Sequence, residues 1–322
     1  MKHSNCMLSL ILLVASSTVA AQSPVDAFPS KTIRVVVAFV PGGITDIVGR
    51  TAARHLEALG QQVIVENRGG AGGQVGSAYV ARAVPDGYTL LIGSLGTHGI
   101  APSLYQKLGY DSVRDYSHVS MLATSGNLLV IHPSIPAKNV RELISLAKNN
   151  PGKLNYAAVG GTSHLSTELF NTMAGIKTTN IPYKGAAPAT VALLSGEIDL
   201  MLHAFSGLLP HVRAAKLRAL GVTTDKRSPT APDIPTLSES GLTGYNAGGW
   251  FSLLAPAGTP DPIVLRLNQS IRKGFESKET VDFFAKQNAQ VMLTTPSEAL
   301  AFLRSEIDKW AKVVKAAGIQ PE

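Results

Sequence analysis

Short apolar runs alternate with segments of helical periodicity along most of this chain. Residues 33–39 form a β-branched, nearly continuous apolar run, which is typical of a buried strand in a parallel sheet. The segment that follows places Val48, Ala52 and Leu56 on one face of a helix, and Gly60 is a typical helix stop. The pattern therefore opens with a strand and a helix, the first half of a βαβ unit.

The same alternation continues to the C-terminus. The pattern predicts further strands at 63–65, 88–93, 127–131, 154–159, 179–183, 198–202, 217–222 and 250–255, and further helices at 77–83, 140–148, 160–174, 188–194, 207–215, 260–275, 281–287 and 296–317. Repeated βαβ units predict an α/β fold with mostly parallel sheets that are covered by helices on both faces.

This number of strands requires two sheets, so we expect two domains. Segments rich in small residues at 123–126 and 244–249 are the expected crossings between them, because hinges often consist of such residues. The chain would build one domain, pass to a second and return to finish the first. The predicted domains are residues 28–124 with 246–322, and residues 125–245.

The N-terminal segment has the features of a secretory signal. Lys2 precedes an apolar run over residues 7–14, and small residues follow that run. We predict a signal peptide over residues 1–21 that is cleaved after Ala21, and hence a periplasmic protein; a buried N-terminal helix is the alternative. The only cysteine, Cys6, lies in this segment, so the mature chain would have no thiol for disulfides, catalysis or metal binding.

Composition and charge narrow the range of partners. The chain is 45% hydrophobic and carries a formal net charge of +7, but its Lys and Arg residues are scattered and only 6% of residues are aromatic. A basic nucleic-acid footprint with stacking aromatics is therefore not indicated, and we interpret the charge as mild attraction for anions. We expect a monomer without a cofactor, a metal ion or a nucleic-acid partner.

Polar, glycine-rich loops follow several of the predicted strands. In open α/β sheets ligands bind beyond the C-terminal strand ends, where helix N-termini offer unpaired N–H groups to anions. The candidate ligand-binding residues are Gly42, Gly43, Thr45 and Asp46 in a first loop, Ser94 and Thr97 in a second, Gly161, Ser163 and His164 in a third, Lys184 in a fourth, and His203 and Ser206 in a fifth. The first two loops fall in one predicted domain and the others in the second, so a small anion would be held from both sides.

Several of these residues also have a structural interpretation. Asp46 and Ser163 could cap helices, Lys184 could be solvated, and His203 could be a hydrogen-bonded core histidine. Residues 69–73 resemble a phosphate loop but lack its Lys-Ser/Thr ending, so we interpret them as a structural loop.

Catalytic patterns are weak. The serine at Ser94 lacks the spacing of a nucleophile elbow, and the histidines form no zinc-like pair at helical spacing. We predict that the protein is not an enzyme. A secreted α/β hydrolase acting on a carboxylate ester is the rival hypothesis, and a cytoplasmic nucleotide-binding enzyme is a third that the signal peptide disfavours.

Six segments, in order from about Phe28 onward, resemble one known family. They are 31–46 (KTIRVVVAFVPGGITD), 65–73 (VENRGGAGG), 85–91 (PDGYTLL), 182–185 (PYKG), 217–220 (LRAL) and 255–260 (APAGTP). They are similar to the Bug receptors, the extracytoplasmic solute receptors of tripartite tricarboxylate transporters.

The resemblance implies a two-lobed, Venus-flytrap periplasmic binding protein of type II. It implies capture of a small carboxylate, such as a di- or tricarboxylate, an amino acid or an aromatic acid, for delivery to a permease of tripartite tricarboxylate type or to a sensor. It also implies that the loop at 42–46 holds a carboxylate, with further contacts from 94–97 and 160–164. His203 stands where relatives often have an acidic residue, which could admit an additional anionic group.

Overall fold

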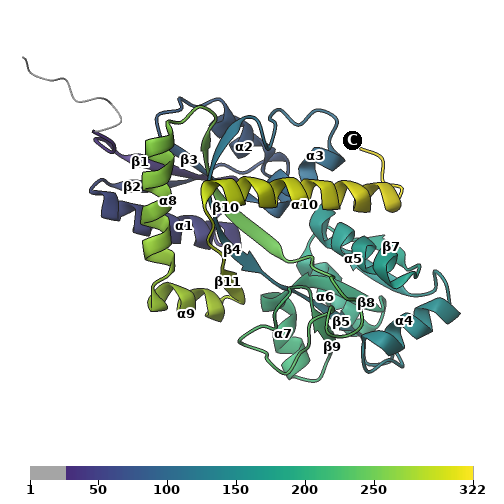
Figure 1. Cartoon of the computed structure of the whole chain (residues 1–322). Helices are drawn as coiled ribbons and strands as arrows, with labels where there is room; N and C mark the ends of the chain where they lie inside the picture. Colours follow the sequence, from purple (N-terminus) through teal and green to yellow (C-terminus); the bar gives the residue numbers. More distant parts are fainter. Residues whose placement is uncertain (1–26, 322) are drawn as a thin grey trace, which may run out of the picture.

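The computed structural model describes residues 27–321, except for the side chains at positions 160 and 206. The predicted signal segment lies outside the described residues. The described chain forms two lobes, with the long helix α10 lying along both of them (Figure 1). Lobe 1 is built on a six-stranded sheet of order β11-β4-β10-β3-β1-β2, and lobe 2 on a five-stranded sheet of order β7-β6-β8-β5-β9.

Lobe 1 combines the N-terminal part of the chain with the C-terminal part. Its elements are β1 (Ile33–Val37), α1 (Ile44–Leu56), η1 (Glu57–Leu59), β2 (Val63–Asn67), η2 (Ala71–Gly73), α2 (Gln74–Ala81), β3 (Thr89–Ser94), η3 (Leu95–Ile100), α3 (Ala101–Leu104), β4 (Tyr116–Ser125), β10 (Gly249–Pro256), α8 (Asp261–Phe275), α9 (Lys278–Lys286), β11 (Ala289–Val291) and α10 (Pro296–Ala316).

Lobe 2 is formed by the middle of the chain. Its elements are β5 (Asn127–Ile131), α4 (Val140–Asn149), β6 (Asn155–Ala158), α5 (Gly160–Ala174), β7 (Thr179–Pro182), α6 (Ala186–Ser195), β8 (Leu200–Ala204), α7 (Phe205–Arg213) and β9 (Arg218–Val222). The chain enters this lobe through Gly126, between β4 and β5, and leaves it through the segment 223–248 that precedes β10.

Both sheets are mixed, so the expectation of mostly parallel sheets is wrong in this respect. The βαβ units pair in parallel, as β1 with β2 and β3, and as β6 with β7 and β8. The strands next to the crossovers pair antiparallel: β10 with β3 and β4, and β5 with β8 and β9. The reason is connectivity, because these strands return from one lobe to the other without a crossover helix within their own sheet.

Strand β4 is the main element that the apolar pattern did not reveal. Its sequence interleaves polar residues with apolar ones, and its pairing with β10 shifts register twice. The polar residues are buried all the same: Ser120 is fully buried, and its hydroxyl donates to the carbonyl of Thr294 at 3.0 Å. A partner elsewhere in the chain therefore satisfies a side chain that looks exposed in the sequence.

Two large apolar cores stabilise the arrangement. One lies between the lobe 1 sheet and helices α1 and α8, and it includes Ile33, Leu56 and Phe275. The other joins the lobes under α10, since it combines Leu129 of β5 with Trp310 of α10. Among residues 27–321, no helix is long and apolar enough to cross a membrane.

Candidate functional site

A cavity of about 520 Å³ lies between the lobes, next to both crossovers. It is lined by Phe39, Gly42, Gly43, Ile44, Thr45, Ile47, Ser94, Leu95, Gly96, Ser125, Gly126, Asn127, Thr162, Ala204, Phe205, Gly249, Trp250, Phe251, Lys286, Gln287 and Asn288. Of the predicted site residues, the set includes Gly42, Gly43, Thr45 and Ser94. The volume is in the range of small-molecule sites.

The N-terminus of α1 opens into this cavity from lobe 1. Gly43 is the N-cap residue and has extended backbone angles, and no side chain caps the helix. The first backbone turn closes through the N–H groups of Asp46 and Ile47, which donate to the carbonyl of Gly43 at 3.0 and 3.1 Å. The earlier residues Ile44 and Thr45 line the cavity, so the first helical N–H groups and the positive end of the helix dipole are available to an anion there.

Asp46 fixes the loop before α1 through hydrogen bonds of its side chain. Its carboxylate is buried and accepts hydrogen bonds from Gly42 N at 3.0 Å, Arg50 Nε at 2.9 Å and Asn67 Nδ2 at 2.9 Å. Burial opposes ionisation, but these three donors outweigh it and hold the pKa of Asp46 below its ordinary value. The structure thus gives Asp46 a positioning role. Because Gly42 has a φ of +95°, the fixed turn also requires a glycine there.

Ser94 and Thr97 form a second loop of lobe 1. The Ser94 hydroxyl accepts from Thr97 N at 3.4 Å and lies 3.0 Å from the Thr97 hydroxyl, so the two residues form a capping box at the start of η3. Thr97 is buried and also lies 2.8 Å from Nδ1 of His98. Burial, with a smaller effect of the nearby His118, lowers the pKa of His98 to about 3. Thr97 therefore fixes the position of Ser94, which lines the cavity. The neutral His98 in turn contacts the Thr97 hydroxyl.

Lobe 2 contributes two further helix N-termini. Helix α5 begins after Val159 and α7 after Ala204, and neither has a side-chain cap. Thr162 in the first turn of α5 lines the cavity, as do Ala204 and Phe205 at the start of α7. Three uncapped N-termini from both lobes thus converge on one cavity.

A missing side-chain cap does not by itself mark a helix that starts at the cavity. Helices α4, α9 and α10 start away from the cavity with capping side chains of Asn139, Ser277 and Thr295. Helices α2, α6 and α8 also start without a side-chain cap and contribute nothing to the cavity lining in the described residues. Lys286 is the one charged side chain among the described residues that line the cavity.

Two predicted contact residues of lobe 2, Ser163 and His164, have side-chain partners within their own lobe, and a third, His203, is half-buried there. The buried Ser163 hydroxyl donates to the carbonyl of Leu202 at 2.8 Å. His164 lies with Nδ1 2.7 Å from the Tyr156 hydroxyl, and burial lowers its pKa. His203 is half-buried on β8, in register with Leu128, and burial lowers its pKa as well. Neither histidine is therefore favoured as a cation for an anionic ligand at neutral pH.

The remaining predicted residues lie at the margins. Lys184 is exposed between β7 and α6. Gly161 faces the other lobe, since a Cβ there would lie 3.2 Å from Leu104 Cδ1. Similarly, a Cβ on Gly96 of lobe 1 would lie 3.6 Å from the Thr162 hydroxyl of lobe 2. The side chain of Ser206 lies outside the described residues.

The glycine-rich loop at 69–73 packs behind the site. A Cβ on Gly73 would lie only 2.5 Å from Cγ2 of Thr97, and the φ of Gly73 is +95°. Glycine is therefore required for packing against the Ser94 loop, which agrees with the structural interpretation of this segment.

The pattern did not point to three further parts of the cavity wall. They are the crossover at Ser125–Asn127, the start of β10 at Gly249–Phe251, and the turn after α9 at Lys286–Asn288. The first two overlap the ends of the small-residue segments 123–126 and 244–249, which the sequence marked as expected hinges and not as parts of the binding site. Nothing local marks the third, because it reaches the site only through the pairing of β11 with β4.

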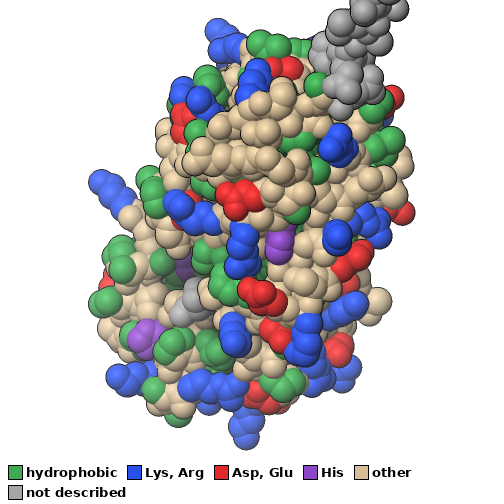
Figure 2. Space-filling model, turned by 90° about the vertical axis from the view of Figure 1, so that its left-hand side faces the viewer, with side chains coloured by type: hydrophobic (Ala, Val, Ile, Leu, Met, Phe, Trp, Pro, Cys, Tyr) green, Lys and Arg blue, Asp and Glu red, His purple; other side chains and the backbone are tan. Residues whose placement is uncertain are grey.

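The surface gives no sign of a single dominant charged region on the face seen in Figure 2. Lys and Arg side chains are scattered over both lobes and interspersed with Asp and Glu. Among the residues that the structure describes, no group of three or more His, Cys, Asp or Glu side chains could hold a metal ion.

Comparisons with known proteins identify the family. The model of the "tripartite tricarboxylate transporter family receptor" matches residues 48–319. Protein BugT of Bordetella pertussis is 37% identical over 311 residues, which cover 95% of each chain.

Solved structures agree in fold. A structure of an R. palustris protein with adipate is 37% identical, with a TM-score of 0.77, and the match covers 92% of this chain and 100% of that one. The periplasmic binding protein BugD is 34% identical with a TM-score of 0.73, over 92% and 100% of the two chains. The chain, with its two α/β lobes around one cavity, therefore belongs to the receptor family of tripartite tricarboxylate transporters, a family of periplasmic solute-binding proteins that includes the Bug proteins.

Proposed function

We propose that this protein captures a small dicarboxylate between its two lobes in the periplasm and delivers it to a permease of tripartite tricarboxylate type. The observation that carries the proposal is the convergence of three uncapped helix N-termini, from both lobes, on one cavity. Lys286 in the wall adds a full positive charge for a second carboxylate. The relative with adipate supports a solute with two such groups.

The binding mechanism follows from the wall chemistry. Backbone N–H groups at the start of α1 bind one carboxylate, and the Ser94 hydroxyl is placed beside them. Apolar side chains such as Ile44, Phe205 and Trp250 cover the carbon chain of the solute. Closure of the lobes removes water from the charged groups, and hydrogen bonds to an ionised partner become stronger in that environment.

The proposal includes the wider setting of the receptor. Residues 28–124 with 246–322 and residues 125–245 act as the two moving domains, which are joined at the crossovers. The protein works as a monomer in the periplasm after removal of residues 1–21. Coupling to a sensor in place of a permease is the variant, and co-purification with membrane proteins from cells that express the receptor separates the two.

The test is a titration of the mature protein with a panel of mono-, di- and tricarboxylates. We expect saturable binding by calorimetry and a higher melting temperature, because a ligand at 100 times its Kd stabilises the native state by about 2.7 kcal/mol. The proposal is wrong if no dicarboxylate shifts the melt.

Gly43→Leu provides the site-specific arm of the test. A Cβ at Gly43 meets no atom within 4 Å, and the backbone is extended, so the fold tolerates a side chain. A leucine there projects into open space at the start of α1 and blocks the carboxylate site. We expect an unchanged melting temperature of the free protein and a loss of binding of at least about 100-fold, whereas Ala311→Leu, at an exposed position of α10 outside the cavity lining, serves as a binding control.

The surroundings of Ser94 argue against the rival hypothesis of a carboxylate-ester hydrolase. The Ser94 hydroxyl lies 3.0 Å from the Thr97 hydroxyl, which in turn lies 2.8 Å from Nδ1 of His98. The Ser94 hydroxyl therefore has no direct hydrogen bond to an imidazole in the described residues, as a serine nucleophile would need. Ester turnover that is lost in Ser94→Ala would revive this hypothesis.

A further inference from the structure

Asn288 lies where the cavity wall of lobe 1 meets a loop of lobe 2. It follows α9 directly after Lys286 and Gln287, and all three residues line the cavity. Its φ is +55°, a left-handed conformation that asparagine adopts more readily than most residues. The same residue also lines a small recess with Thr224 and Ser228 on the side of lobe 2.

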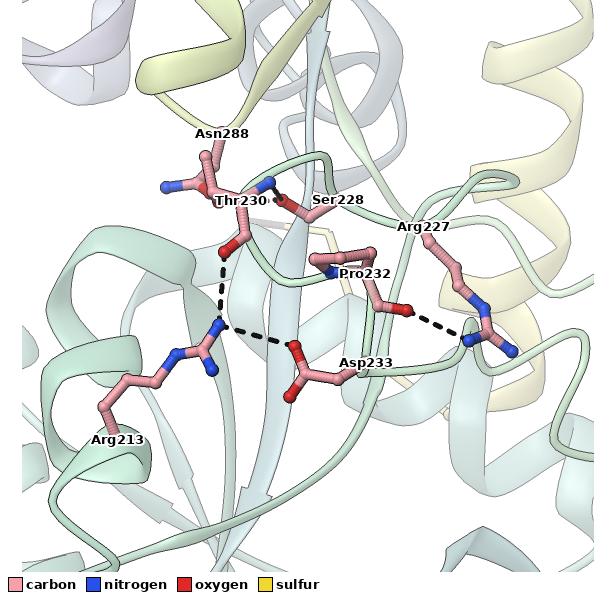
Figure 3. A network of polar contacts seen from close by, with 7 residues as sticks. All are labelled: Arg213, Arg227, Ser228, Thr230, Pro232, Asp233 and Asn288. Atoms are coloured by element: carbon pink, nitrogen blue, oxygen red, sulfur yellow. Dashed lines mark hydrogen bonds and ion pairs between the residues drawn. The ribbon is translucent and has the colours of Figure 1, made fainter.

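Two hydroxyl groups of lobe 2 hold the amide oxygen of Asn288. Ser228 donates to Oδ1 at 3.2 Å, and Thr230 donates to the same atom. Figure 3 shows Ser228 and Thr230 side by side facing Asn288, with the amide nitrogen directed away from them. These are direct side-chain hydrogen bonds between the lobes, next to the cavity.

The loop that presents these hydroxyls is itself fixed. Arg213, at the end of α7, donates to the Thr230 carbonyl at 3.2 Å and pairs with Asp233 at 3.4 Å. Arg227 donates to the Pro232 carbonyl at 3.0 Å (Figure 3). The loop is thus tied to α7, and Phe205 at the other end of α7 lines the cavity.

An amide side chain has an acceptor on one side and a donor group on the other. Because both hydroxyls donate to Oδ1, the amide is oriented with its NH₂ group away from the loop. The NH₂ group is then available to an acceptor in the cavity, whose wall also includes Lys286. A carboxylate is the acceptor that suits both groups.

We propose that Asn288 is a specificity-determining residue of the solute site, which donates to a solute carboxylate and is oriented for this by Ser228 and Thr230 of the opposite lobe. The inference rests on the proposed function and names the second carboxylate-recognition point within it. The solute then links Asn288 to lobe 2, so solute binding and contact between the lobes favour one another. A solute with an ester or an alkyl group at this end lacks the charge and the full acceptor capacity, and it is selected against.

The experiment compares three variants of the mature protein by calorimetric titration with adipate and with its monomethyl ester. Asn288→Asp keeps the shape and the acceptor but replaces the donor by a negative charge, so adipate should bind more than about tenfold more weakly. Ser228→Ala/Thr230→Val removes the orienting hydroxyls and leaves the amide, so adipate should bind about five- to tenfold more weakly and the preference over the ester should shrink. The matched control is Ser240→Ala in the same segment. The Ser240 hydroxyl donates to the Thr236 carbonyl at 2.7 Å, away from Asn288, so this change should leave both affinities unchanged.

Combining the changes tests the coupling. In Asn288→Asp/Ser228→Ala/Thr230→Val the loss should be smaller than the sum of the separate losses, because both changes remove parts of one interaction. Asn288→Gly, which fits the positive φ and lacks the amide, gives the same test if the aspartate variant does not fold.

The outcomes separate this inference from the proposed function. Wild-type protein that binds adipate, together with wild-type affinity and selectivity in the Asn288 and Ser228/Thr230 variants, overturns the inference and leaves the receptor function intact. Wild-type protein that binds no dicarboxylate overturns both. Weaker binding in the two sets of variants, with an unchanged control, supports the role of Asn288.

Discussion

At the scale of single residues, polar side chains of the site divide into those that face the cavity and those that hold the former in place. Ser94 lines the cavity, and the Thr97 hydroxyl fixes the position of Ser94. The N-terminus of α1 also lines the cavity, and the Asp46 carboxylate fixes the loop that precedes α1. Such supporting contacts fix a site geometry before the ligand arrives, which lowers the entropic cost of binding.

The support by Asp46 predicts a dependence of stability on pH. Because the folded-state pKa of Asp46 lies below its ordinary value of 3.8, its contribution is fully present above pH 3.8 and is lost as the pH falls through the folded pKa. We expect Asp46→Asn to be less stable than wild type by about 1–3 kcal/mol at pH 7, with a smaller difference in acid.

Urea unfolding of both proteins at pH 7 and at pH 3 checks this expectation. The control is Asp282→Asn, whose carboxylate forms an exposed pair with Lys278, and which should change stability by less than about 0.5 kcal/mol. A constant difference between wild type and Asp46→Asn at both pH values would contradict the assignment.

At the scale of elements, α10 connects the core of lobe 1 to lobe 2. A capping box of Thr295 and Glu298 starts the helix, and its buried face carries Glu306 and Trp310. One carboxylate oxygen of Glu306 accepts from the indoles of Trp250, at 2.9 Å, and Trp310, at 3.1 Å. Since Trp250 also lines the cavity, α10 fixes one wall of the site.

Removal of this acceptor should be costly. Glu306→Ala leaves two buried indole N–H groups without the carboxylate, so we expect a loss of unfolding free energy of about 2–4 kcal/mol. Glu306→Gln retains an oxygen that can accept from the indoles and should lose less. Denaturant midpoints of the two variants decide the question, and equal losses would show that the charge matters more than the hydrogen bonds.

At the scale of the whole molecule, the two lobes enclose the cavity and approach one another at its wall. Gly96 of lobe 1 and Thr162 of lobe 2 approach closely, since a Cβ on Gly96 would lie 3.6 Å from the Thr162 hydroxyl. In a cysteine pair the sulfur at position 162 would stand near the place of this hydroxyl, so the Gly96 side could reach it and form a disulfide after small adjustments. The sole cysteine, Cys6, lies in the predicted signal segment, so an engineered pair would have no competing thiol in the mature chain.

The double variant Gly96→Cys/Thr162→Cys should therefore lock the lobes together on oxidation. Adipate added before oxidation should be retained through gel filtration, and adipate added afterwards should be excluded, with reduction reversing both effects. The single-cysteine variants are the controls. Free exchange of the solute in the oxidised double variant would show that access does not require separation of the lobes.

The sequence by itself determined the local elements and the start of the site. Continuous apolar runs and apolar positions at helical spacing depend only on neighbouring residues, so most strands and helices could be predicted, together with the glycine turn before α1 and the Ser94 loop. It also carried ordered motifs that identified the family. Strand β4 was missed because partners such as Thr294, far along the chain, satisfy its buried polar side chains.

Only the tertiary structure decided which strands pair antiparallel and which polar groups face the cavity. The direction of a side chain at a helix start depends on neighbours that the fold supplies. The Ser163 hydroxyl donates to the Leu202 carbonyl, and the His164 imidazole forms a hydrogen bond with the Tyr156 hydroxyl. Lys286 and Asn288 reach the site only because β11 pairs with β4 beside the crossover. Long-range strand pairing leaves no signal in the local sequence. The part of the cavity wall that would bind the second carboxylate in the proposed function therefore could not be predicted from the sequence.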